Sequence, residues 1–226
     1  MNSNKVTSVI AGSLFLTAMA ASLIGGGLIE SILNSPDYLI NLFTGKTQVL
    51  IGVSLELINS IAVIGIAVVL FPILKEHNES IALGYAGFRV IESVFCIVSA
   101  IIPLSLITLS GEYLKNKASD HSYFQILGNL LMEARADLAG MLIPVFFGLG
   151  AVLFYYLLFQ SKLIPRFISV WGFIGALLIL ALCFWEPGII INMIFVLPII
   201  LNEIFMGIWL IVKGFTPSES LPVMEK

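Results

Sequence analysis

Charged residues are scarce in this chain. Only 11% of its 226 residues are charged, whereas 59% are apolar and the mean hydropathy is +1.06. Soluble domains carry about 25% charged residues, so this chain cannot build an aqueous surface. The net charge of −3 is mild. It gives no reason to expect nucleic acid or an acidic-lipid anchor as the main partner.

Cysteine and histidine are nearly absent, with two of each. Cys96 and Cys183 lie inside apolar runs, where they predict small core side chains and no disulfide framework. His77 and His121 fall in polar loops, which argues against a bis-histidine haem or an intramembrane zinc protease. With one aspartate near a span and no phosphate-binding glycine loop, the sequence assigns no catalytic residue, metal ligand or cofactor.

Long apolar runs dominate what remains. A spanning helix needs about 20 apolar residues, and six segments qualify. They are residues 6–29, 49–74, 81–109, 137–159, 167–185 and 189–212. We therefore predict an all-α, polytopic transmembrane helix bundle of about six spans. Residues 1–215 form one transmembrane domain, and residues 216–226, which contain Pro217 and Pro222, are expected to form a flexible cytoplasmic tail.

The first run resembles a secretory signal, because Lys5 and the small-residue motif Ala18-Met19-Ala20 imitate its charge and cleavage site. The run continues to Ile29, however, which favours a retained span. Cleavage would leave five spans and an external N-terminus. With six spans, basic residues predict that both termini of this cell-membrane protein are cytoplasmic. The inner side then carries Lys5, Lys75, Lys162, Arg166, Lys213 and Lys226, against Lys46, Lys115 and Lys117 outside.

An amphipathic segment leads into the fourth span. Apolar residues recur at helical spacing from Phe124 to Leu138. A polar stripe lies opposite them, at Gln125, Asn129, Glu133 and Asp137. This pattern predicts a helix in or rising through the outer interface of the membrane.

Arg135 falls on the apolar side of that segment, so it must snorkel to the surface or pair with an acid. Judged by depth, its available acids are Glu30 in the first span and Glu56 in the second. We therefore predict an outer cluster of Arg135 and Glu30 with Glu133 and Asp137. An alternative is that Glu133 and Asp137 are simply solvated.

Further charges interrupt the spans themselves. Arg89 and Glu203 lie about equally far from the cytoplasmic ends of their spans, and Glu92 lies one turn from Arg89. Arg89 can therefore sit between Glu92 in its own helix and Glu203 across the bundle. Polar residues that could join this inner cluster are Asn202, Asn59 and Glu56. The cluster is either an ion pair that fixes helix packing or a proton, ion or ligand site.

Several segments together resemble a known family. They run from Leu74 through Lys75-Glu76-His77-Asn78-Glu79 to Glu92, from Gly148 to Arg166, and from Glu203 to Phe215. Their ordered combination, from about residue 8 to Phe215, resembles the uncharacterised prokaryotic membrane family called domain of unknown function 4386. The resemblance implies a multi-spanning prokaryotic membrane protein whose pattern includes Arg89, Glu92 and Glu203. It implies no reaction, substrate or cofactor.

Three functions are consistent with these patterns. The one that the sequence favours is a non-catalytic scaffold, sensor or accessory protein whose buried charges hold the bundle together. The alternative is a transporter of a small solute, ion or lipid that uses the inner cluster as its site. An intramembrane enzyme, with acid–base work by Glu92 or Glu203, is the third. The expected partners are the lipid bilayer and a membrane protein or second copy of the chain, without nucleic acid.

Overall fold

The chain is helical almost throughout. The computed structural model describes residues 3–115, 121–185 and 188–216, and no strand occurs among them. The predicted tail at 217–226 lies outside the described residues. The elements are α1 (Ser3–Leu33), α2 (Tyr38–Thr44), α3 (Lys46–Lys75), α4 (Glu79–Lys115), α5 (His121–Asp137), the π-helix η1 (Leu138–Leu142), α6 (Ile143–Ser161), α7 (Arg166–Leu182) and α8 (Ile189–Val212).

Five of these helices are long and apolar enough to cross a membrane. They are α1, α3, α4, the continuous α5–η1–α6 helix and α8. The fifth predicted span, 167–185, corresponds to α7, which has only 17 residues and ends at Leu182. At about 1.5 Å per residue, α7 is roughly 26 Å long, slightly less than the ~30 Å hydrocarbon core. The all-α polytopic bundle is confirmed, with α7 as its short member.

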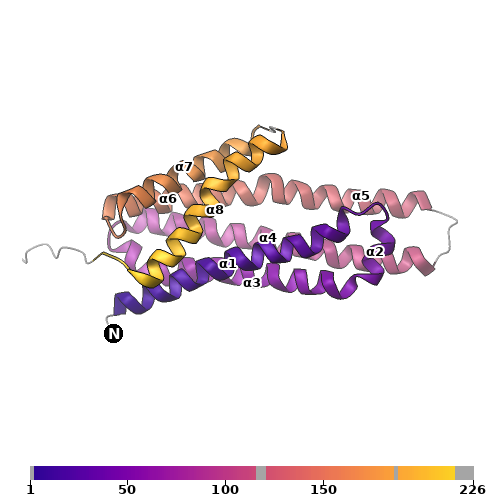
Figure 1. The fold of residues 1–226 in the computed structure, drawn as a ribbon, viewed down its shortest axis with the longest axis horizontal. Coiled ribbons are helices and arrows are strands. Elements are labelled where there is room, and N and C mark those ends of the chain that lie inside the picture. The colour runs from indigo at the N-terminus through magenta and orange to yellow at the C-terminus, as the bar shows by residue number, and fades with distance from the viewer. Residues whose placement is uncertain (1–2, 116–120, 186–187, 217–226) are drawn as a thin grey trace, which may run out of the picture.

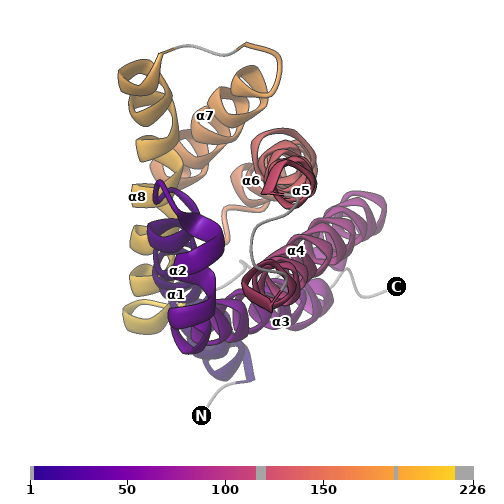
Figure 2. The same cartoon turned by 90° about the vertical axis from the view of Figure 1, so that its right-hand side faces the viewer.

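The long helices form a ring. Each contacts the next in the order α1, α3, α4, α6, α7 and α8, and α8 returns to α1. Figure 2 shows this arrangement along the bundle, with α5–α6 on one side and α1 and α8 on the other. The chain enters and leaves at the same end of the ring, which we call the terminal end (Figure 1). There the Thr216 amide donates to the Leu163 carbonyl at 2.8 Å.

Two pairs of glycines permit close helix crossings. A Cβ on Gly25 would lie 2.9 Å from the Gly52 carbonyl oxygen, and a Cβ on Gly52 would lie 2.9 Å from that of Gly25. The same reciprocal contact joins Gly12 of α1 to Gly207 of α8. Small residues let membrane helices pack backbone against backbone. The two crossings fix α1 between α3 and α8.

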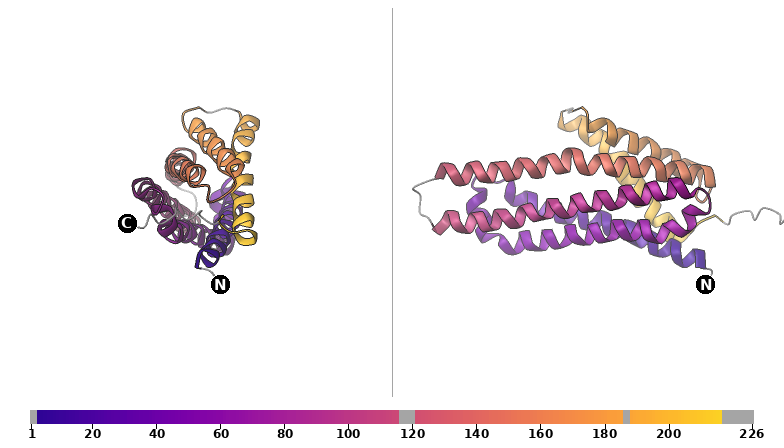
Figure 3. Two further views of the ribbon diagram at one scale, coloured as in Figure 1. Left: turned by 90° about the vertical axis from the view of Figure 1, so that its left-hand side faces the viewer. Right: turned by 180° about the vertical axis from the view of Figure 1, so that it is seen from behind.

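The other end of the ring carries α2 and the helix that precedes the fourth span. α5 corresponds to the predicted amphipathic helix, and it runs through η1 into α6 as one rod beside α4 (Figure 3). α2 packs on α4, where the Ser110 hydroxyl donates to the Leu39 carbonyl. The Tyr38 hydroxyl donates to Asn129 Oδ1 at 3.1 Å. Burial raises the pKa of Tyr38 above its ordinary value.

The apolar core has two parts. The larger lies towards the terminal end and includes Phe15, Ile66 and Phe154. The smaller lies towards α2 and includes Ile29 and Leu106. Most of the charged side chains inside the ring lie between these two parts.

Candidate functional site

A cavity of about 410 Å³ lies inside the ring. Side chains from α1, α3, α4, α5, η1, α6 and α8 line it. Its polar lining includes Glu30, Glu56, Asn59, Arg89, Glu92, Cys96, Ser99, Arg135 and Glu203. The inner and outer clusters were predicted as separate levels, and the structure brings members of both to one cavity.

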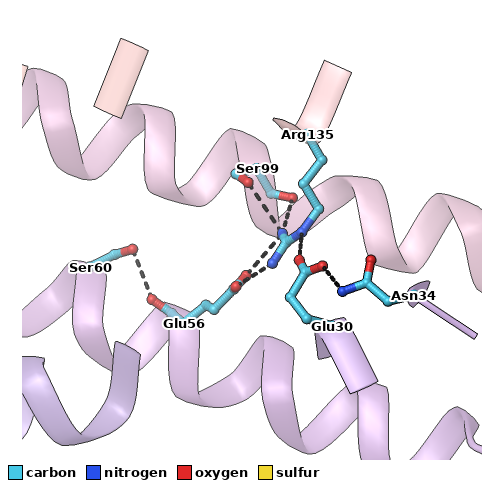
Figure 4. Close-up of polar contacts among 6 residues, drawn as sticks. All are labelled: Glu30, Asn34, Glu56, Ser60, Ser99 and Arg135. Carbon is cyan, nitrogen blue, oxygen red and sulfur yellow. Dashed lines mark hydrogen bonds and ion pairs between the residues drawn. The ribbon is translucent and has the colours of Figure 1, made fainter. Parts of the chain in front are cut away.

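Arg135 organises one end of this cavity (Figure 4). Its guanidinium donates two hydrogen bonds to the Glu56 carboxylate, at 2.5 and 3.4 Å, and one to the Glu30 carboxylate, at 3.2 Å. It also donates to the carbonyl and the hydroxyl of Ser99, at 3.1 and 3.2 Å. Arg135 is only 7% exposed. The planar guanidinium suits this two-pronged contact with a carboxylate, and the contacts join α5 to α1, α3 and α4. We call Arg135, Glu30, Glu56 and Ser99 together the Arg135 clamp.

The other acids predicted for the outer cluster lie apart from Arg135. Glu133 and Asp137 are both exposed, and neither forms an ion pair with another residue that the structure describes. Asp137 lines a neighbouring groove. Glu56, which the sequence offered both to the inner cluster and as an acid available to Arg135, is the closest partner of Arg135.

At mid-depth, Arg89 pairs with Glu92 of its own helix at 2.9 Å. Both residues are buried, with 4% and 5% exposure. Arg89 also lies over the Phe147 ring of α6, 5.6 Å from its centroid. The Arg89 Nε is buried without a hydrogen-bond partner. The ion-pair partner of Arg89 is therefore Glu92, three residues further along the same face of α4.

Glu203 does not complete the predicted bridge. It lines the same cavity as Arg89, yet no ion pair within 4.0 Å joins them or links Glu203 to any other described residue. Its neighbour Asn202 is fully buried and donates to the Ile168 carbonyl at 3.0 Å, which ties α8 to α7. Asn59 lines the cavity. The inner cluster thus contains a carboxylate with no protein cation in contact.

The charges around the cavity do not balance. Its lining holds four carboxylates, Glu30, Glu56, Glu92 and Glu203, against the two guanidiniums of Arg89 and Arg135. In formal charge this leaves an excess of two negative charges. Glu203 is half-buried. Holding a carboxylate away from water without a counter-charge is costly, so the site favours a proton or a cationic ligand beside Glu203.

The sequence profile of a family described as a domain of unknown function (DUF4386) matches residues 10–214 of the chain. The chain belongs to the DUF4386 family. The matched stretch contains both clusters and all of the ring except the first turns of α1, which confirms the resemblance noted from the sequence. No curated protein and no solved structure matches the chain.

In this DUF4386 protein, sequence reasoning overlooked two cavity residues of α4. Ser99 binds Arg135, and Cys96 lies between Ser99 and Glu92 on the lining. The sequence does contain a pattern that points to them, because residues 89, 92, 96 and 99 follow one another at spacings of three, four and three. That pattern marks a single face of an α-helix. Following the face outwards from Arg89 and Glu92 would have found both residues.

The π-helix is a second feature that the sequence did not reveal. The cavity residues Arg135, Ala139, Ile143 and Phe147 recur every four positions across η1. In a regular α-helix, with about 100° per residue, 12 positions would turn Phe147 away from Arg135 by roughly 120°. The wider π turn removes much of that drift. The π turn therefore lets Arg135 of α5 and the aromatic side chain of Phe147 in α6 face the same cavity.

The side chains of the cavity lining determine which ligands the cavity could hold. No group of three or more metal-ligating side chains occurs among the residues that the structure describes. The cavity instead offers the Glu203 carboxylate, the ion pairs of Arg89 and Arg135, the Asn59 amide and the Cys96 thiol. These groups suit a small cationic or hydrogen-bonding solute held inside the bundle.

Proposed function

We propose that this integral membrane protein binds a small cationic solute inside the ring, as a carrier or a sensor. The observation that carries the proposal is Glu203, a carboxylate of α8 that lines the cavity and has no cationic side chain of the described residues in contact. A charge kept within a span normally has a partner or a task. The Arg89–Glu92 ion pair lies within one helix, so it does not itself join two helices. The Arg135 clamp performs that structural role.

Thermal unfolding of the purified protein tests the proposal. Methylammonium, acetate and urea serve as small cationic, anionic and neutral probes. A ligand that binds only the folded state at ten times its Kd adds about 1.4 kcal/mol of stability. For a chain of this size, that raises the unfolding midpoint by ~3–5 °C. We expect methylammonium alone to give the shift.

The control compares two variants, each measured with and without methylammonium. Glu203→Gln keeps the shape of the side chain and removes its charge, so the shift should disappear. Lys115→Ala alters an exposed pair at the far end of α4 and should leave the shift intact. Equal shifts with methylammonium and acetate, or a shift that survives Glu203→Gln, would contradict the proposal.

We also propose that both termini lie in the cytoplasm. The terminal end of the ring carries Lys5, Lys75, Lys162, Arg166 and Lys213. Basic residues favour the cytoplasmic side of a membrane. A green fluorescent protein fused after Lys226 should therefore fluoresce, whereas activity of alkaline phosphatase fused at the same position would contradict this orientation.

A further inference from the structure

A second cavity, of about 790 Å³, extends sideways from the first. It lies between α1, η1, α7 and α8, and we call it the lateral groove. The residues that line both spaces are Met19, Ser22, Ala139, Phe147 and Glu203. The carboxylate without a protein cation therefore stands at the junction of the cavity and the groove.

The groove opens through the side of the ring. α8 crosses α1 closely where Gly12 meets Gly207, and the two helices then diverge towards the other end (Figure 1). Two residues that line the groove, Leu23 of α1 and Met141 of η1, are 55% and 49% exposed. Apolar side chains at this depth of a membrane protein face lipid chains. A molecule dissolved in the bilayer can therefore reach Glu203 without crossing water.

The lining matches one kind of molecule. Most of it is apolar, with Ile179, Leu182, Val196, Ile199 and Ile200 among the residues. Among the described residues that line the groove, the charged ones are Asp137 and Glu203, both acidic, and none is a lysine, arginine or histidine. An alkyl chain therefore suits the apolar walls of the groove, and a positively charged head group suits the end at Glu203.

The length of the groove fits an extended chain. Asn192, Val196, Ile199 and Glu203 lie on one face of α8, at spacings of four, three and four residues. Eleven steps of about 1.5 Å separate Asn192 from Glu203 along the helix axis, which is roughly 16 Å. Trp185 lines the end of the groove away from Glu203.

Arg89 provides an independent indication of a ligand near the junction. This residue is 4% exposed and lines the main cavity, yet its Nε–H donor has no hydrogen-bond partner. Buried donors in folded proteins are usually satisfied by protein or water. A head group that brings an oxygen beside its amine would supply the missing acceptor.

We propose that the lateral groove admits from the bilayer a single-chain amphiphile whose head group carries a protonated amine and, beside it, a hydroxyl oxygen that accepts from Arg89. The amine pairs with Glu203 at the junction, and the alkyl chain lies along the groove towards Trp185. This proposal rests on the proposed function, since it assumes that the cavity binds a cation. It adds the alkyl chain and the route of access.

Quenching of Trp185 fluorescence tests the proposal directly. In the Trp171→Phe, Trp209→Phe background, Trp185 is the remaining tryptophan of the chain. The probe is dodecylammonium with a terminal bromine atom, which quenches indole on contact, and the protein is held in nanodiscs. We expect saturable quenching, with a half-saturation concentration raised at least about tenfold by Glu203→Gln. The matching brominated dodecanoate should quench only weakly.

Two glycine variants supply a matched control. Gly140 of η1 lines the groove, whereas Gly87 belongs to α4 and does not line it. A Cβ at either position meets no atom within 4 Å. Gly140→Leu should fill the groove and weaken quenching by dodecylammonium, whereas Gly87→Leu should not. Equal quenching by the dodecanoate, or no effect of Glu203→Gln, would overturn the proposal.

Competition separates this inference from the proposed function. Unlabelled dodecylammonium should displace the brominated probe at far lower concentration than methylammonium. Equal displacement by both would overturn the amphiphile proposal, while the methylammonium-dependent thermal shift would still support a cation site. If methylammonium does not raise the unfolding midpoint of the unsubstituted protein, the proposed function itself is contradicted.

Discussion

Two arginines inside one membrane protein do different work at the scale of single residues. Arg135 reaches Glu30, Glu56 and Ser99, which belong to three other helices. Arg89 satisfies its charge with Glu92, one turn along its own helix. Depth alone could not have separated these roles. The number of helices that each guanidinium joins does separate them, and it assigns stability mainly to Arg135.

Arg135→Ala should therefore destabilise the bundle. It strands Glu56, whose side chain is 16% exposed, and leaves Ser99 without its donor. Breaking a buried pair costs about 3–5 kcal/mol, and the half-exposed Glu30 puts the expected loss near the lower end. Equilibrium unfolding in detergent measures it.

Lys115→Ala is the matched control for Arg135→Ala. Its pair with Glu112 is exposed, with 73% and 52% side-chain exposure, so its loss should change stability by less than ~1 kcal/mol. Arg135→Lys should recover only part of the loss, since one ammonium cannot reproduce the forked contact with Glu56. Equal stabilities of Arg135→Ala and Lys115→Ala would refute the clamp.

The sequence predicted the clamp better than the inner cluster. Arg135 was paired with Glu30 and Glu56 because their depths matched and few acids were available. Glu203 was placed against Arg89 by the same argument, but the structure shows no contact within 4.0 Å. Depth along a helix can be counted from the sequence, whereas the rotation of each helix about its axis depends on how all six pack.

At the scale of elements, the α1–α3 crossing is the clearest target. Gly25 and Gly27 belong to one glycine triplet, but a Cβ at Gly25 meets the backbone of Gly52 whereas one at Gly27 meets nothing within 4 Å. Gly25→Leu should force α1 and α3 apart and cost at least ~2 kcal/mol, as overpacked sites do. Gly27→Leu should be tolerated. The thermal unfolding midpoints of the two variants decide the matter.

The π-helix η1 is the second element with a distinct role. Deleting Gly140 should convert η1 to regular α-helix and turn α6 relative to α5 by about 100°. If the Arg135 clamp holds, Phe147 then leaves Arg89, and the binding of methylammonium should be lost. Gly140→Ala keeps the residue count and should retain binding. Retention of binding by the deletion variant would show that η1 does not align the two parts of the site.

At the scale of the whole molecule, hydropathy was sufficient to predict a helical bundle and its approximate spans. It could not predict a ring, because apolar residues facing lipid and apolar residues facing protein look alike in sequence. The short α7 illustrates this point: its run to residue 185 is apolar, yet the helix ends at Leu182. The lateral groove follows from α8 diverging from α1, which is a property of the assembled helices.

Cysteine modification tests the central claim, a cation-selective cavity inside the ring, most directly. Cys96 lines the main cavity, and Cys183→Ser leaves it as the single thiol of the chain. The rates of its reaction with a trimethylammonium and a sulfonate methanethiosulfonate of similar size should be compared. Because four carboxylates face two guanidiniums, the cationic reagent should react faster, and Glu203→Gln should reduce the preference. Equal rates for both reagents, or no reaction of Cys96 with either, would contradict the account.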